Sequence, residues 1–411
     1  MIRVLAAAAL VILYAAAAAA QTATAPGFIE ARGLLFPDRA PNDRTRAVSD
    51  WLWRQEGVLR PSSWLQFVAG VDLRANTHDQ VEDVWRIDWE DRHLRPPRIS
   101  VRRLAATITT GNLTLDVGKQ FIRWARADVL NPIDRFAPRD YLNVINSEFL
   151  PVIAGRATLQ AGSEVFEAVW VPHFTPSRMP LLNQRWTVLP PEAAGVSIFD
   201  AGSRFPSRTQ AGGRWRHIGS RLEVGLSYVD GYNHHPDIDV EPLDVSGRSV
   251  SLTRVFSRLR SGGFELAIPT RWITFKGEAA WFGHPHSSTA DYGLYVSEIE
   301  RQIGEWLFTV GYAGEVRESD EVPLAFDPER SLARSFLWRL AYTVDPRRSI
   351  TVEGVTRQSG DGFYFRGEYS QAFGEFWRFT ITPVVLRGDE DDFIGQFRHN
   401  SHLAAALRVS F

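Results

Sequence analysis

Hydrophobic and polar residues alternate strictly over the last ten positions of the chain. Leu403, Leu407 and Phe411 fall on one side of this stretch, and His402 and Arg408 fall on the other. A repeat of two residues indicates a β-strand, because successive side chains of a strand point to opposite faces. One apolar face and one small or polar face suit a transmembrane β-barrel, which has hydrocarbon outside and water inside. An edge strand of a soluble β-protein is the alternative.

The same alternation returns along the whole chain, for example over residues 64–74. Residues 50–59 also fit the apolar stripe of a helix, but a strand is favoured there because a short turn follows at 60–63. We therefore expect eighteen strands, near residues 26–36, 50–59, 64–74, 98–109, 113–124, 150–160, 163–172, 208–217, 221–230, 250–267, 272–282, 291–301, 305–316, 333–343, 349–357, 362–372, 376–386 and 401–411.

The connections between these strands alternate between short and long. Eight are short, at RPSS, GN, AGS, IGS, PTR, QIG, DPRR and FGE. Eight turns on one side of a membrane require eighteen strands when both termini lie on that side, as in single-chain outer-membrane barrels. The pattern predicts an all-β, antiparallel, up-and-down transmembrane barrel of about eighteen strands. Without the two N-terminal strands the count would be sixteen.

Tryptophan placement supports the same architecture. Trp64, Trp272, Trp306 and Trp377 each come within a residue or two after an expected short turn. Amphipathic rings prefer the membrane interface, so these four side chains would form an aromatic girdle on the short-turn side.

Composition sets the compartment. Residues 1–20 carry one early charge, Arg3, and an apolar run that ends in small residues, which predicts a secretory signal cleaved near Ala20. Residues 21–411 would then form a single barrel domain, and no later apolar run approaches the ~18 residues of a membrane helix. The chain has no cysteine, and 46 basic residues against 48 acidic ones give a net charge of -2, so nucleic acid is not an expected partner.

Charged residues within the strands share the parity of the inward face. Placing them towards lipid would cost roughly 2 to 4 kcal/mol for each Arg or Lys at the midplane, so a wet lumen is predicted. They either pair across strands and stiffen the wall, or contact solute, and their basic excess favours anionic solutes weakly. The residues expected to face the lumen are Arg156, Arg214, Arg216, Lys276, Glu278, Arg339, Glu353, Arg366, Glu368, Arg378 and Arg408.

One long connection is unusually rich in opposed charges. A segment near residues 125–149 leaves a strand on the long-loop side and contains two prolines. Such a loop can constrict a pore and set a transverse field, or its charges can simply pin it to the wall; both readings are open. The candidate constriction residues are Arg123, Arg126, Asp128, Asp134, Arg135, Arg139 and Asp140.

The same stretch carries a family resemblance. The residues involved are Gly118, Lys119, Gln120, Trp124, Asn131 and Pro132, followed by Arg139 and Asp140. In this G-K-Q…W…NP…RD arrangement the chain resembles poorly characterised bacterial outer-membrane barrels, distantly similar to alginate-export porins. Ala125 stands where a glycine is more usual. The resemblance implies a channel with this loop folded into the lumen, and it does not assign alginate as the solute.

We expect a porin-like channel of the bacterial outer membrane for small polar or charged solutes. A plugged receptor or adhesion barrel is the first alternative and an outer-membrane enzyme the second. No catalytic or nucleotide-binding motif is present, and no enzyme activity, metal or cofactor is expected. Expected partners are membrane lipid, lipopolysaccharide, a small solute and the barrel-assembly machinery. The last expectation rests on the terminal Phe411, which resembles the C-terminal aromatic of bacterial outer-membrane proteins.

Overall fold

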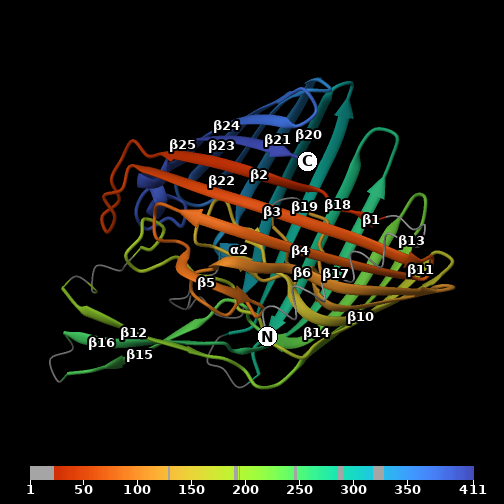
Figure 1. Ribbon diagram of the computed structural model, residues 1–411, viewed down its shortest axis with the longest axis horizontal. Coiled ribbons are helices and arrows are strands. Elements are labelled where there is room, and N and C mark those ends of the chain that lie inside the picture. Colours follow the sequence, from red (N-terminus) through yellow and green to blue (C-terminus); the bar gives the residue numbers. More distant parts are fainter. Residues whose placement is uncertain are drawn as a thin grey trace.

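The protein is a closed β-barrel of eighteen strands (Figure 1). The structure, a computed structural model, describes residues 23–127, 130–188, 193, 195–244, 248–285, 290–317 and 328–411. The expected leader, residues 1–20, lies outside these described residues, and so does Asp128. No helix among the described residues is long and apolar enough to span a membrane.

Each wall strand pairs antiparallel with its neighbours in the chain. The eighteen strands are β2 (Gly27–Leu35), β3 (Ala47–Ser62), β4 (Leu65–Asn76), β6 (Pro97–Thr110), β7 (Leu113–Gln120), β10 (Val152–Ala161), β11 (Glu164–Val171), β13 (Gln210–Ile218), β14 (Glu223–Tyr232), β17 (Arg258–Pro269), β18 (Thr274–Gly283), β19 (Tyr292–Ile303), β20 (Trp306–Arg317), β21 (Ser335–Asp345), β22 (Arg348–Arg357), β23 (Phe363–Phe373), β24 (Trp377–Arg387) and β25 (His402–Ser410).

The barrel closes between its first and last wall strands. Residues Phe28 to Leu35 of β2 pair with residues of β25. Gly27 and Phe411 exchange two backbone hydrogen bonds, each 2.9 Å long, at the end of this seam. Closure leaves no wall strand with an unpaired edge, which a membrane-spanning sheet requires because lipid cannot satisfy backbone groups.

The strand count and all eight short turns are confirmed. Residues 50–59 lie in the strand β3, so the helical alternative is wrong and the fallback of sixteen strands is not needed. Two expected strands have different bounds. The strand expected at 113–124 ends at Gln120, and the one at 250–267 is divided between β16 (Ser249–Val255) and β17.

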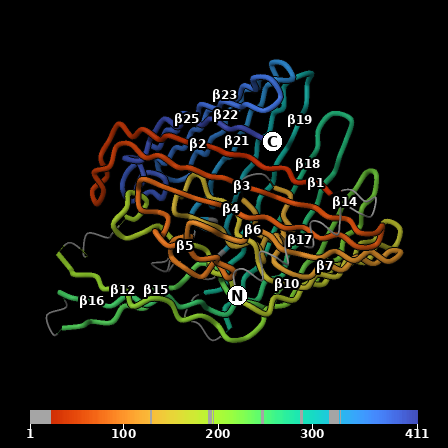
Figure 2. The backbone as a smooth tube through the Cα atoms, in the orientation of Figure 1, coloured from red at the N-terminus to blue at the C-terminus, as the bar shows by residue number. Residues whose placement is uncertain are grey.

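Several shorter elements lie outside the eighteen strands. β12 (Ser197–Arg204), β16 and β15 (Asp237–Pro242) form a separate three-stranded sheet that reaches beyond the barrel at the lower left of Figures 1 and 2. The remaining elements are β1 (Ala23–Thr24), β5 (Glu82–Asp88), β8 (Arg139–Asp140), β9 (Glu148–Phe149), the short helix α2 (Pro328–Ser331) and the 3-10 helix η2 (Gly395–Asn400).

β5 completes the wall where a spanning strand stops early. β7 ends at Gln120 and its chain turns into the lumen. Beyond that point β5 pairs in parallel with β6, matching Ile87 with Ile99 and Asp88 with Ser100. Trp85 and Ile87 of β5 are 66% and 67% exposed, so this added strand carries apolar side chains on its outer face, as the spanning strands do.

The outer surface is apolar at the short-turn end. Trp64, Trp272, Trp306 and Trp377 are all exposed, at or just after four of the eight short turns. Their positions are those of the aromatic girdle that the sequence predicts.

Candidate functional site

The connection between β7 and β10, residues 121–151, is folded into the barrel and is called the inner loop below. Its side chains Ile122, Trp124, Ile133 and Phe136 are buried against inward-facing residues of the wall. These wall residues are Val152, Ala154, Val169, Val171, Val229, Leu259, Ala280 and Phe282. Part of the inner wall is therefore apolar and covered by the loop, a feature that the prediction of a wet lumen did not include.

The start of the inner loop binds the carboxylates of one wall. The Trp124 indole N–H donates to Glu167 on β11. The backbone N–H groups of Arg126 and Ala127 both donate to Glu278 on β18, at 2.7 Å for Ala127. The Arg126 guanidinium pairs with Glu223 on β14 and lies 3.9 Å from Glu265 on β17. Four neighbouring carboxylates on this side are thus engaged by residues 124–127.

The G-K-Q residues of the motif fix the point where the chain leaves the wall. Gly118 has φ +126°, and a Cβ there would collide with the backbone of Leu104. The Lys119 ammonium is buried and lies 2.6 Å from an Asp91 carboxylate oxygen. The Gln120 side chain donates to the backbone carbonyl of Ala154, 3.0 Å away. Each contact joins the chain to a neighbouring strand or loop, so these residues anchor the inner loop.

The later motif residues hold the loop to itself. Asn131 and Pro132 are buried, and the Asn131 amide donates to the carbonyl of Ala127. Arg139 donates to the Asn131 side-chain oxygen at 2.8 Å, and its guanidinium lies 4.0 Å from the ring centre of Phe149. These residues therefore stabilise the fold of the loop.

The charged residues proposed for the constriction are mostly engaged with protein. Asp134 is buried and accepts the backbone N–H groups of Trp124 and Ala125. Arg123 lies 3.4 Å from Asp134 and 4.0 Å from the ring centre of Phe149. Arg135 lies 5.0 Å from the ring centre of Phe282. Of these candidates, Asp140 lines the smaller of the two cavities described below.

A second connection also folds inward, and nothing in the sequence pattern predicted it. Arg178 and Arg185, both in the segment between β11 and β12, are 4% and 3% exposed. Arg178 pairs with Asp140 of the inner loop at 2.8 Å. Arg185 donates to the backbone carbonyl of Thr45 at 2.8 Å. Nothing near these two arginines in the sequence marks them as buried, because their acidic partners are distant in sequence.

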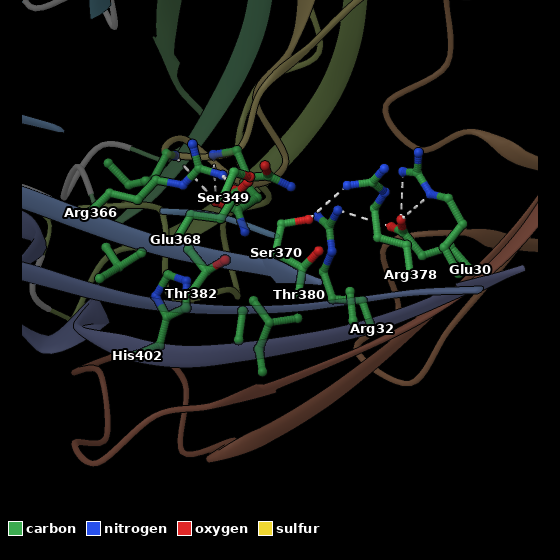
Figure 3. A pocket seen from close by; sticks show the side chains of 18 residues that line it. Glu30, Arg32, Ser349, Arg366, Glu368, Ser370, Arg378, Thr380, Thr382 and His402 are labelled. Carbon is green, nitrogen blue, oxygen red and sulfur yellow. Dashed lines mark hydrogen bonds and ion pairs between the residues drawn. The ribbon is translucent and has the colours of Figure 1, made fainter. Parts of the chain in front are cut away.

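The main cavity lies between the tip of the inner loop and the wall formed by β22, β23, β24, β25 and β2 (Figure 3). Its volume is about 320 Å³. Asn143, Ile145 and Asn146 line it on the loop side. On the wall side its charged residues are Arg32, Arg366, Arg378, Arg408, Glu30 and Glu368.

The charge of this main cavity is unbalanced, with four arginines against two glutamates. Glu30 pairs with Arg408 at 2.6 Å and with Arg32 at 3.0 Å. Glu368 pairs with Arg366 at 2.5 Å. Within the described part of the chain Arg378 has no carboxylate partner; it donates to the Ser370 hydroxyl at 2.9 Å. The residues that line the cavity therefore carry a surplus of two positive charges, and Glu353, which lies just outside the lining, is 3.3 Å from Arg366.

A smaller cavity of about 130 Å³ lies on the other side of the loop tip, against β2, β3 and β4. It shares Asn143, Asn146, Glu30 and Arg32 with the main cavity. Four carboxylates line it, from Glu30, Asp50, Asp140 and Glu148, and only two arginines, Arg32 and Arg74.

Its loop carboxylates are nevertheless engaged by cations. Asp140 is held by Arg178, as described above, and Glu148 lies 3.0 Å from Arg74, 3.3 Å from Arg54 and 3.6 Å from Arg102. Although burial alone raises the pKa of Glu148, these guanidinium groups hold it well below its usual range. Glu148 therefore remains ionised and paired.

The other charged residues predicted to face the lumen do not line the main cavity, and most of them pair with neighbours. Arg156 bonds to Asp116 at 2.7 Å, and Lys276 to Glu300 at 2.8 Å. Arg214 pairs with Glu265 and donates to the carbonyl of Trp124. Glu353 lies 3.3 Å from Arg366. Glu278 binds the inner loop, Arg216 lies on β13, and Arg339 lies on β21 opposite Glu353 of β22 in the strand register.

No protein-family model and no curated protein matches the sequence. Solved structures do match over nearly the whole chain. A BenF-like porin from Pseudomonas fluorescens Pf-5 has a TM-score of 0.55 at 13% identity, and OccAB4 from Acinetobacter baumannii has 0.55 at 11%; each match covers 95% of this chain and 98% of the other. OpdK from Pseudomonas aeruginosa, in a structure with vanillate, has 0.51 at 12% and covers 94% and 98%.

These identities establish the fold alone. The arrangement of a closed eighteen-strand wall with inward-folded loops agrees with the porin-like barrel that the sequence predicts. The chain therefore has the fold of the porins.

Proposed function

We propose that the protein is a porin-like channel of the bacterial outer membrane through which small anionic solutes diffuse. One observation carries the proposal. The inner loop engages four carboxylates on one side of the barrel, and the main cavity on the other side keeps four arginines against two glutamates. The inner loop covers the first set of carboxylates, whereas the arginines of the main cavity border open space. In the smaller cavity the loop carboxylates Asp140 and Glu148 are paired with arginines.

Arginines line this side over several consecutive strands. Each strand from β23 round to β6 contributes at least one: Arg366, Arg378, Arg408, Arg32, Arg54, Arg74 and then Arg102 and Arg103. Several of these arginines pair with carboxylates, for example Arg54 and Arg74 with Asp72. An excess of one sign of charge beside low-dielectric walls still focuses the field and raises the local concentration of ions of opposite charge. An anion would therefore exchange from one guanidinium to the next along the wall.

The likeness to OpdK agrees with this preference. Its structure contains vanillate, an aromatic carboxylate, and the two chains share the fold at 12% identity. From the motif at 118–140 we also propose a distant relationship to alginate-export porins. This relationship does not assign alginate as the solute.

The test is a recording of the purified protein in planar bilayers under a KCl gradient. We expect stepwise conductance with a reversal potential that indicates chloride preference over potassium. Cation preference would contradict the anionic assignment while leaving a channel. If protein that migrates on gels as a folded, heat-modifiable barrel carried no current, the proposed channel function would be contradicted.

A plugged receptor is the second candidate, and the three-stranded sheet favours it. This sheet of β12, β15 and β16 projects from the barrel and exposes Phe199, Ile238 and Val240, as a surface for a macromolecular partner would. A receptor would be silent in the same recordings and would bind a partner through this sheet.

The remaining assignments follow from the same proposal. The protein would be exported through its leader, delivered to the assembly machinery by its last strand and embedded in lipid and lipopolysaccharide. We propose that it carries out no reaction of its own. Liposome swelling with a series of carboxylates and neutral sugars of matched size would identify the solute class.

A further inference from the structure

Arg178 joins three separate excursions of the chain. Its guanidinium lies 2.8 Å from Asp140 of the inner loop and 2.8 Å from Asp91 of the β5–β6 connection. Its Nε donates to the carbonyl of His93 at 3.3 Å. Arg178 itself belongs to the connection between β11 and β12. Its side chain therefore joins three different strand connections of the barrel.

The backbone reinforces the contact on one side. Arg178 N–H donates to the carbonyl of Arg139, and Tyr141 N–H donates to the carbonyl of Arg178, both at 2.9 Å. Asp140 and Arg178 thus form an isolated parallel β-bridge. The ion pair and the bridge hold the same two segments, so the position of residue 140 is fixed relative to residue 178.

Asp91 extends the contact to the wall. Its carboxylate lies between Arg178 and Lys119, and the ammonium of Lys119 is 2.6 Å away. Lys119 is 1% exposed and belongs to β7, at the point where the inner loop begins. The series Lys119, Asp91, Arg178 and Asp140 therefore connects the beginning of the inner loop, through two other segments, to its middle.

The residues that line the passage come directly after this fixed point. Asn143 and Asn146 border both cavities, and Asp140 borders the smaller one. A displacement of residue 140 would carry the tip, residues 141–149, towards or away from the arginine wall.

We propose that Arg178 is the positioning residue that sets the width of the passage. This inference rests on the proposed channel function, and it assigns the bore to a residue outside the inner loop. Buried charge pairs that are fully hydrogen-bonded restrict the geometry of the groups they join, whereas a surface pair of equal length does not. Without Arg178 the partly buried Asp140 would lose the cation that it pairs with, and Asp91 would keep Lys119 alone, so the loop tip would move to hydrate Asp140.

The first test compares single-channel recordings of wild type, Arg178→Gln, Arg178→Lys and Arg204→Gln. Arg204 is the matched control, because it is the same residue type, pairs with Asp239 at the same 2.8 Å, and is 66% exposed on the outer sheet. We expect Arg178→Gln to raise the conductance by about two-fold and to increase current noise, since the narrowest segment dominates the resistance of a pore. Arg178→Lys should behave similarly, because an ammonium lacks the planar fork that bonds two carboxylates at once. Arg204→Gln should match wild type.

A second variant keeps the test decisive if Arg178→Gln fails to fold. The chain contains no cysteine, so the double variant Asp140→Cys/Arg178→Cys introduces the only pair of thiols. Residues opposed across a β-bridge lie roughly 4.8 Å apart, within the Cα separation that a disulfide accepts. The oxidised form should show the wild-type conductance and the reduced form the raised conductance, reversibly in one recording.

The outcomes are distinguishable. A silent wild type contradicts the channel function before the variants are considered. A conducting wild type with unchanged Arg178→Gln, or with equal conductance in the oxidised and reduced double variant, overturns the assignment of Arg178. A double variant that never forms a disulfide contradicts the β-bridge and overturns it as well.

Discussion

Arg102 and Arg103 are consecutive in the chain, yet both side chains lie on the same face of β6. The pairing of β6 with β4 slips by one residue here, and a Cβ placed on Gly70 would lie 3.5 Å from that of Arg103 and 3.7 Å from that of Arg102. Two residues opposed to one is a β-bulge, a device that re-aims a side chain. It directs into the lumen an arginine that strict alternation would have pointed at lipid.

Arg103 should contribute to anion preference. In the described part of the chain it has no ion pair, and its Nε is buried without a hydrogen-bond partner. Arg103→Gln should shift the reversal potential of the channel towards the equilibrium potential of potassium. Arg60→Gln, in an exposed position beside the first short turn, is the control and should leave it unchanged. An equal shift in both variants would contradict a specific role for the bulge.

Arg378→Gln should reduce anion preference more than any other single change in the main cavity. In the described part of the chain its guanidinium donates to a hydroxyl and pairs with no carboxylate. Its charge is therefore less compensated than that of Arg408 or Arg366. A unit charge about 4 Å from an ion contributes about 1 kcal/mol in water, so a loss of up to about five-fold in the chloride-to-potassium permeability ratio is expected. Reversal potentials measure it, and a smaller effect than that of Arg408→Gln would contradict the ranking.

Asp134→Asn should loosen the inner loop without unfolding the barrel. One carboxylate oxygen of Asp134 accepts two backbone N–H groups, and the other lies 3.4 Å from the Arg123 guanidinium. An asparagine oxygen could still accept both N–H groups, but without the negative charge, and its NH2 group would face the Arg123 guanidinium. Loss of a buried, charge-assisted bond costs about 1 to 3 kcal/mol. We expect protease to cleave residues 121–151 faster than in the wild type. The barrel itself should remain folded and still show a heat-dependent shift in gel mobility. Asp79→Asn, at an exposed ion pair with Arg95, is the control.

Gly118 should not tolerate a side chain. Its φ of +126° is nearly confined to glycine, and an added Cβ would meet the backbone of Leu104. Gly118→Ala should therefore lower the yield of folded, heat-modifiable barrel. Gly111 also has a positive φ, +54°, but has open space around it, so Gly111→Asn should fold normally. Equal yields from both variants would show that the space at residue 118 is not limiting.

The packing of the inward loops should weaken in acid because of His234. Its ring nitrogens lie 2.7 Å from the carbonyl oxygen of Thr175 and 3.0 Å from that of Arg135. Burial lowers the pKa of His234 to about 4, so the ring is neutral in the folded protein above that pH. The unfolded loop takes up a proton near pH 6.5, hence stability is constant above pH 6.5 and falls between pH 6.5 and 4, by roughly 3 kcal/mol at most.

Channel noise and protease sensitivity measured from pH 8 to pH 4 test this dependence. His234→Gln keeps a neutral donor and should flatten the change over the pH 6.5 to 4 window. An unaltered pH profile in that variant would assign the acid sensitivity to other groups.

The wall was predictable from sequence because its rules are local. Alternation places Phe336 outward and Leu337 inward, and a turn such as Gly111-Asn112 marks each reversal. The site was predictable only in part. The pattern identified the inner loop and the arginines of β23 to β25, but not Arg178, whose partners lie far from it in the chain. The bulge at Arg102 was missed because it interrupts the alternation on which the prediction depends.

The seam between β2 and β25 has a consequence for biogenesis. The Arg408 guanidinium donates to the Glu30 carboxylate, 378 positions away in the chain. No shortened product can complete a lumen, because its first wall strand would wait for a partner that was never synthesised. The lumen can therefore be sealed only after β25 has been synthesised, so closure of the barrel is the last pairing step and not an early one.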